Sequence, residues 1–422
     1  MLQFETSEKD LSVTPFLDQL QVEFKKIQQV MATGGYVDDR ASLNLLDDQA
    51  MLERIAQLAK PYQDAKVVIL VGMGGPGLGA RAVQEALTGI YHNLNHTPRI
   101  FYADTVDSVR LDSILKIAEK TLKDRQKLTV IIATQSGGTT ETIAAAATLQ
   151  ALFQSTGIDP AQHMPLITNE DSKLDVWGDE HGFTRILVPP KIGGRYSIFS
   201  PVGLFPLAVL GFDIQTLVKG ARAVRDQTLT GGIKKSIAAL SAVQIAKHYK
   251  TGKNIHVTFI FAPELESIGL WCRQIMAESL GKNQLGITPT VAIGSRELHS
   301  MFQLYMDGPD DKITTFVKIM RTNGRTVPEE NIFSTLVESI ENKSFQAITE
   351  AIFSGVVRAY TEKKRQYAIL SLPQISAETI GSFLQFKMLE TMFLGSILGV
   401  NPFDQPGVEA YKVETKRILA EK

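Results

Sequence analysis

Short segments that are almost wholly apolar recur along this 422-residue chain, and most are followed by a loop of small residues and then by a helix-like segment. Residues 128–134 (LTVIIAT) are typical of them. A strand without polar alternation is buried on both faces, so its alternation with helices predicts an α/β fold of parallel sheets covered by helices. We expect strands at residues 66–71, 99–102, 128–134, 163–168, 184–188, 254–261, 290–293, 312–321 and 366–372.

The strands fall into two series that are separated by helix-rich sequence. A chain of this length corresponds to about two or three domains of roughly 150 residues each. We therefore expect an N-terminal helical segment (1–60), a first doubly wound α/β domain (61–215) and a second one (216–422) that ends in a helix. Helices are expected at residues 14–31, 80–90, 141–153, 264–280, 296–306, 377–398 and 406–421.

Charge and cysteine content exclude several classes of protein. Lys plus Arg is 44 and Asp plus Glu is 45, which argues against a nucleic-acid partner because phosphate contacts need a basic excess. The single cysteine, Cys272, excludes an internal disulfide framework and a cysteine-based zinc site. No signal-like or membrane-spanning segment is evident. These observations predict a cytoplasmic enzyme or binding protein with no membrane partner, and the histidines form no convincing metal set.

A glycine-rich loop follows the first expected strand. Gly72, Gly74 and Gly77 satisfy the G-x-G-x-x-G pattern of dinucleotide-binding folds. That pattern also needs an acidic residue about 20 positions further on, and Asp104 comes later than that. Pro76 removes a backbone N–H that would hold pyrophosphate. We favour a small anion at a helix N-terminus, with a dinucleotide site and a purely structural turn as the alternatives.

A second loop of small residues follows the strand at residues 128–134. It carries the hydroxyls of Thr134, Ser136, Thr139 and Thr140 directly before an expected helix. Hydroxyls and oriented amides suit a phosphate monoester without requiring a positive chain. The alternative is a polar turn that only caps the helix.

Several charged residues lie where the pattern expects apolar contact or a close backbone approach. Arg195 follows two glycines, and Glu278 lies beside Gln274 at the edge of the buried face of the helix expected at 264–280. A carboxylate there is paired, has a raised pKa, faces a cavity or reaches solvent. His299 is either a structural histidine or a functional one. Lys412 either reaches solvent from the apolar stripe of the last helix or points into a cleft.

Four runs of residues resemble the glucose-6-phosphate isomerase (phosphoglucose isomerase) family, which is built from two sugar-isomerase (SIS) domains. The resemblance, together with the two loops, covers the chain from about residue 66 to residue 412, and the runs occur in the family's order. They are GGRYS (193–197), MAESLGK (276–282), ELHS with YMDGP (297–300 and 305–309) and NPFDQPGVEAYK (401–412).

This resemblance implies reversible isomerisation of glucose 6-phosphate to fructose 6-phosphate through a cis-enediolate, in glycolysis and gluconeogenesis, without a metal or organic cofactor. It implies that Glu278 is the base and that Arg195 stabilises the enediolate. It also implies that Lys412 and His299 assist ring opening, with His299 contributed by the neighbouring subunit of a homodimer. The residues that it assigns to substrate binding are Gly75, Thr134, Ser136, Thr139, Gly194, Gln274 and Gln405.

Two positions depart from the family pattern. Pro76 stands where the first loop usually has a serine, and Gln135 stands where the second usually has a lysine. Both changes remove phosphate contacts, so we expect a raised KM or a shifted sugar-phosphate preference. The alternative functions are a non-catalytic sugar-phosphate-binding SIS protein, a dinucleotide-dependent dehydrogenase and an isomerase that also accepts mannose 6-phosphate.

Overall fold

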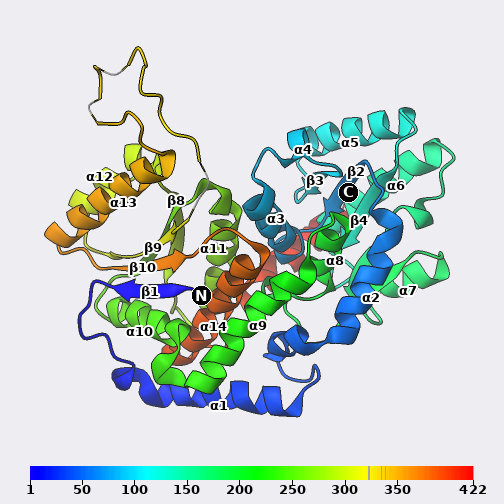
Figure 1. Cartoon of the computed structure of the whole chain (residues 1–422). Coiled ribbons are helices and arrows are strands. Elements are labelled where there is room, and N and C mark those ends of the chain that lie inside the picture. The colour runs from blue at the N-terminus through cyan, green and yellow to red at the C-terminus, as the bar shows by residue number, and fades with distance from the viewer. Residues whose placement is uncertain (322–323, 334, 338, 422) are drawn as a thin grey trace.

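Two five-stranded sheets lie side by side at the centres of two α/β units in the computed structural model (Figure 1). The structure describes residues 1–321, 324–333, 335–337 and 339–421. No helix within these ranges is long and apolar enough to cross a membrane.

The first sheet is wholly parallel and has the strand order β3-β2-β4-β5-β6. Its central strands β2 and β4 are buried along their whole length, as their almost wholly apolar sequences require. Helices α5, α6 and α7 share a core with one face, and α3 and α8 share a core with the other. The elements are β2 (Val67–Val71), α3 (Gly75–Thr88), α4 (His92–Asn95), β3 (Arg99–Ala103), α5 (Ser108–Lys123), β4 (Leu128–Ala133), α6 (Thr140–Ser155), β5 (Leu166–Asn169), α7 (Lys173–Glu180), β6 (Arg185–Val188) and α8 (Pro201–Val209).

The second sheet repeats this topology, although no repeat is visible in the sequence. Its order is β1-β10-β9-β7-β8, so β8-β7-β9-β10 corresponds to β3-β2-β4-β5 of the first sheet. An aromatic cluster that includes Phe259, Phe316 and Phe353 packs two helices, α12 (Phe302–Asp307) and α13 (Phe345–Glu362), against one face of this sheet. The elements are α10 (Ile237–Lys250), β7 (Ile255–Phe261), α11 (Glu266–Leu280), β8 (Thr288–Ile293), α12 (Phe302–Asp307), β9 (Lys312–Ile319), α13 (Phe345–Glu362) and β10 (Tyr367–Leu372).

Helix α14 (Ala377–Leu398) is almost entirely buried and packs against α9 (Ile214–Gly231), α10 and α11. Two glycines permit the close approach of α14 and α9. A Cβ on Gly220 would lie 1.8 Å from the Glu378 carbonyl oxygen, and one on Gly381 would lie 1.8 Å from the Leu217 carbonyl oxygen. Helix α11 also packs against α3 of the first unit, so the two units share one large apolar core.

The N-terminal segment contains α1 (Leu17–Thr33) and α2 (Gln49–Ala59), as expected, but it begins with a strand. Residues of β1 (Gln3–Thr6) pair antiparallel with β10, with Phe4 opposite Leu370. The expectation of a helical segment is therefore wrong at residues 3–6. A strand of four residues carries too little alternation to be distinguished, and its partner lies at the other end of the chain. The domain limits at residues 60 and 215 stay a prediction.

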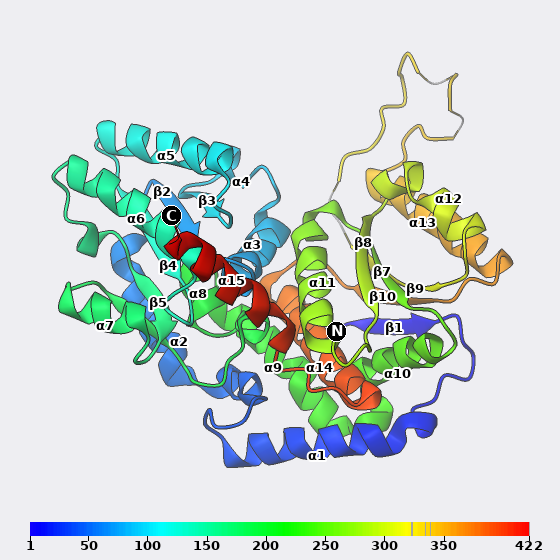
Figure 2. The ribbon, with the colours of Figure 1, turned by 180° about the vertical axis from the view of Figure 1, so that it is seen from behind.

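Every expected strand is present, and α14 has the bounds that its pattern predicted. The helix expected at residues 296–306 is wrong, because the chain forms a 3-10 turn, Arg296–His299, and then the separate helix α12. Ser300, with φ −135° and ψ −53°, lies outside the helical conformation and separates the two. The last helix, α15 (Glu409–Ala420), starts a few residues later than expected and crosses from the second unit toward the first (Figure 2).

Candidate active site

A cavity of about 310 Å³ opens at the carboxyl ends of β2 and β4, between the first sheet, α11 and α15. Strands β3 and β4 lie on opposite sides of β2, so the strand order reverses here, which is where open α/β sheets bind ligands. The cavity gathers every predicted site residue except His299. These lining residues are Gly75, Thr134, Ser136, Thr139, Gly194, Arg195, Gln274, Glu278, Gln405 and Lys412.

The first glycine loop touches the backbone of the loop that carries Arg195, residues 189–200 between β6 and α8, which we call the arginine loop. Gly74 precedes α3 and has φ +63°, a conformation that favours glycine. Pro76 lies in the first turn of α3, where backbone N–H groups make no helical hydrogen bond, so the N–H that proline lacks is not needed there. A Cβ on Gly75 would lie 2.2 Å from the Gly194 carbonyl oxygen. Only glycine fits at position 75, so the contact between the two loops depends on this residue.

The second loop presents its hydroxyls at the amino end of α6. Thr134 Oγ1 and Thr139 Oγ1 are 2.9 Å apart, and the Gly138 N–H donates to Ser136 Oγ at 3.4 Å. Gln135 holds the arginine loop, because its Nε2 donates to the Ile192 carbonyl at 2.8 Å. Hydroxyls, amides and a helix N-terminus together form a site suited to a small anion.

Arg195 is 2% exposed and donates hydrogen bonds in several directions. Its Nε donates to Ser279 Oγ at 2.7 Å and its Nη1 to Gln405 Oε1 at 3.0 Å. Its Nη2 donates to the carbonyls of Pro402 at 2.7 Å and Asp404 at 3.0 Å. A buried guanidinium with these fixed partners is a preorganised positive charge at the cavity wall.

Glu278 faces the cavity from α11 and is paired with Arg195. The distance from Arg195 Nη1 to Glu278 Oε2 is 3.6 Å, and the Glu278 side chain is 33% exposed. Gln274, one helical turn earlier, donates from Nε2 to Glu278 Oε1 at 3.1 Å. The Gln274 Oε1 atom is buried without a hydrogen-bond partner in the described part of the chain. A carboxylate thus lies between an oriented amide and a fixed cation.

Lys412 and His299 differ in position. Lys412 lies on α15 at the cavity and forms an ion pair with Glu409 at 2.8 Å. His299 is exposed in the 3-10 turn after β8 and does not line the cavity of its own chain. Its contribution from a neighbouring subunit stays a prediction.

The structure adds a lysine that the sequence reasoning did not single out. Lys282 Nζ pairs with Asp404 at 2.8 Å and donates to the Ser279 carbonyl at 3.0 Å. Burial lowers the pKa of Lys282, and the hydrogen bond from Lys282 lowers the pKa of Asp404. Both residues lie within the runs quoted above, but nothing in their spacing indicated that they meet.

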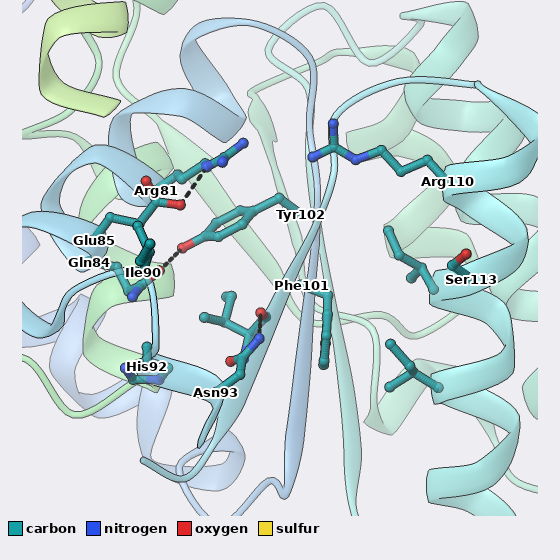
Figure 3. A pocket seen from close by; sticks show the side chains of 13 residues that line it. Arg81, Gln84, Glu85, Ile90, His92, Asn93, Phe101, Tyr102, Arg110 and Ser113 are labelled. Atoms are coloured by element: carbon teal, nitrogen blue, oxygen red, sulfur yellow. Dashed lines mark hydrogen bonds and ion pairs between the residues drawn. The ribbon is translucent and has the colours of Figure 1, made fainter. Parts of the chain in front are cut away.

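A separate pocket of about 300 Å³ lies between α3, β3 and α5 (Figure 3). Asp104, the acidic residue that a dinucleotide site would need, already pairs with Arg110 at 3.1 Å and with Arg81 at 3.6 Å. Arg81 also pairs with Glu85 at 2.8 Å. The carboxylate is therefore engaged by two arginines, which gives no support to the dinucleotide alternative. Within the ranges that the structure describes, no group of three or more His, Cys, Asp or Glu side chains could hold a metal ion.

Two units with mostly parallel sheets and a cavity at a strand-order reversal define a doubly wound α/β protein. A tagatose-6-phosphate ketose/aldose isomerase from Escherichia coli shares this fold, with a TM-score of 0.51 at 12% identity over 92% of this chain and 93% of that one. Residues 56–422 match the family described as phosphoglucose isomerase. The chain belongs to the phosphoglucose isomerase family.

Individual relatives agree with this assignment. A glucose-6-phosphate isomerase from Rubrobacter xylanophilus is 34% identical over 81% of this chain and 80% of its own length. The crystal structure of a hypothetical protein from Thermus thermophilus has a TM-score of 0.87 at 27% identity and covers 100% of both chains. The likeness thus extends over the whole fold.

Proposed function

We propose that this chain interconverts glucose 6-phosphate and fructose 6-phosphate, a reaction of glycolysis and gluconeogenesis. One observation carries the proposal: a carboxylate and a buried guanidinium, Glu278 and Arg195, lie 3.6 Å apart in a cavity that also contains an anion-type loop. Family membership and the activity named for the Rubrobacter relative support it.

The reaction moves one proton between neighbouring carbons of the open-chain sugar. Glu278 takes the proton from C2, the electron pair forms the C1=C2 bond, and the negative charge moves to the C1 oxygen. The proton then returns to C1, while the C2 hydroxyl proton passes to the C1 oxygen and C2 becomes the carbonyl. A positioned base contributes about 10²–10⁴ in rate. A fixed donor such as Arg195 at the developing oxyanion is worth about 3–4 kcal/mol.

The phosphate provides binding energy away from the reacting carbons. Thr134, Ser136 and Thr139 would donate hydroxyl hydrogen bonds to it, and the Gln274 amide would add another. The glycines at positions 75 and 194 would let the backbone approach the sugar phosphate closely, and Gln405 would line the sugar site. Such remote contacts orient C1 and C2 for the proton transfer.

Ring opening needs a proton donor and an acceptor, and we assign these roles to Lys412 and His299. Lys412 lies at the cavity, whereas His299 is exposed on the second unit. The proposal therefore includes a homodimer in which each subunit supplies His299 to the other. It also places the enzyme in the cytoplasm.

The test is a coupled assay of fructose 6-phosphate conversion to glucose 6-phosphate, with EDTA present and no added metal. Wild type should turn over. Glu278→Gln keeps the shape and loses the base, so kcat should fall by at least about 10² while sugar-phosphate binding persists. A variant that retained most of its activity would contradict the mechanism. A wild type that binds the sugar phosphates without turnover would favour the non-catalytic alternative.

Shared sites have a test of their own. Glu278→Gln chains and His299→Ala chains should each be inactive, and their mixture should regain part of the activity after subunit exchange. In the mixed dimer, one site receives an intact Glu278 and an intact His299. No recovery, with exchange shown by mass spectrometry, would show that the two residues do not work across subunits.

A further inference from the structure

The loop of residues 401–405, between α14 and α15, fixes the Arg195 side chain. Its Pro402 and Asp404 carbonyls and its Gln405 amide oxygen accept hydrogen bonds from the guanidinium. Pro402 is buried, but Asp404 and Gln405 are exposed. An exposed loop therefore sets the position of a buried catalytic cation, and its own anchoring becomes important for the reaction.

The N-terminal segment contacts this loop at Phe403. The Arg40 guanidinium lies over the Phe403 ring, with Cζ 4.9 Å from the ring centroid. The same ring packs against Tyr196, the neighbour of Arg195 in the chain, at a centroid distance of 5.3 Å. Phe403 thus joins the N-terminal segment to the arginine loop.

Arg40 is held rigidly for this contact. Its Nε and Nη2 atoms donate to the two carboxylate oxygens of Glu23 on α1 at 2.7 and 2.8 Å. The side chain of Glu23 is 3% exposed and that of Arg40 is 11% exposed. A two-pronged pair of this kind fixes the plane of the guanidinium, which a lysine at the same place could not do.

We propose that Arg40 is a positioning residue of the isomerase site. It braces the loop of residues 401–405 through Phe403 and so holds Arg195 in place beside Glu278. The inference rests on the proposed function and assigns the N-terminal segment a part in it. Because Arg195 acts on the charge that develops during reaction, loosening the brace lowers kcat more than it raises KM.

Two variants separate this role from general stability. Arg40→Ala removes the brace but leaves the Glu23 carboxylate buried without its partner, so it also destabilises the fold. Phe403→Leu removes the cation–π contact with Arg40 and the ring contact with Tyr196, and it leaves the Arg40–Glu23 pair intact. Each should lower kcat about tenfold, with KM within about threefold, which corresponds to a loss of about 1.4 kcal/mol in the transition state.

Further variants test whether the two-pronged guanidinium of Arg40 is needed and whether Arg40 acts through Phe403. Arg40→Lys keeps the charge without the fork and should not restore kcat. The double variant Arg40→Ala with Phe403→Leu should be no slower than the slower single variant, since Arg40 acts on Arg195 only through the Phe403 ring. Arg54→Ala, at an exposed position of α2 in the same segment, is the matched control and should keep wild-type kcat.

Hydrogen exchange tests the brace without relying on activity. The Phe403 N–H donates to Asn401 Oδ1 at 3.1 Å. In Arg40→Ala, a peptide covering residues 401–405 should exchange its amide hydrogens faster, while peptides from β2 and β4 should not. Unchanged exchange there, or folded Arg40→Ala and Phe403→Leu proteins with wild-type kcat, would overturn the inference. A wild type without isomerase activity would overturn the proposed function instead, and the exchange measurement would still decide on the brace.

Discussion

Replacing Gly75 by alanine tests how closely the first glycine loop and the arginine loop must fit together at the proposed site. A Cβ at this position would lie 2.2 Å from the Gly194 carbonyl oxygen, 2.4 Å from its carbonyl carbon and 3.0 Å from the Arg195 nitrogen. Nonbonded heavy atoms settle about 3.5–4.0 Å apart, so the arginine loop must retreat by roughly 1 Å. The clash involves backbone atoms, which cannot move aside by a rotamer change.

That displacement acts directly on the Glu278–Arg195 pair, whose closest atoms are 3.6 Å apart. A misplacement of about 1 Å can cost about 10² in rate, so we expect kcat of Gly75→Ala to fall about 100-fold. Overpacking should also reduce the free energy of unfolding by about 1–3 kcal/mol. The measurements are the coupled isomerase assay and urea unfolding.

Gly193→Ala is the matched control in the arginine loop. A Cβ on Gly193 meets no heavy atom within 4 Å, so this variant should keep both kcat and stability close to the wild-type values. If Gly75→Ala were as active as Gly193→Ala, the close approach of the two loops would have no catalytic role. Equal losses in both variants would mean that the loop needs flexibility and not fit.

Three further predictions concern phosphate binding, acid stability and the buried thiol. Gln135→Lys restores the positive charge that is usual in the family. Its KM for glucose 6-phosphate should fall about tenfold or more below that of the wild type, which is the effect expected of one added charge-assisted hydrogen bond to the phosphate. An unexceptional KM of the wild type would refute the expectation that its phosphate binding is weak. Lys282 lowers the pKa of Asp404, so this contact stabilises the fold above the unfolded pKa of about 3.9 and is lost as the pH falls through the lower folded pKa. Asp404→Asn should therefore lower Tm at pH 5–7, and the difference from wild type should shrink below pH 4; a constant difference would contradict the assignment. Burial raises the pKa of the Cys272 thiol to about 12, so iodoacetamide at pH 8 should label it only in urea, and rapid labelling of the native protein would show that α11 opens.

Much of the site could be predicted from the sequence because each loop carries its own local signal. Thr134, Ser136 and Thr139 directly follow a buried strand and precede a helix, so their place at the carboxyl edge of a sheet follows from the order of elements. The family resemblance then supplied roles for Glu278 and Arg195. Helical periodicity alone did not decide between several environments for Glu278, because periodicity places a residue on one face of a helix without showing what packs against that face.

Contacts between distant segments could not be predicted in this way. Lys282 meets Asp404, and Arg40 meets Phe403, across large separations along the chain. Strand β1 could not be predicted for the same reason. Its four residues alternate only weakly between apolar and polar, and they form a strand because they pair with β10. The sequence around one residue of each pair contains no pattern that indicates its partner.

The sequence by itself determined that the chain forms mostly parallel sheets and that loops of small residues follow two buried strands, because burial on both faces imposes apolar strands and sharp turns impose glycine. Only the tertiary structure decided that Glu278 lies beside Arg195, that Lys412 reaches the cavity and that His299 does not. Local propensity acts over a few residues, whereas the packing of α11, α14 and the N-terminal segment brings together groups from the whole chain.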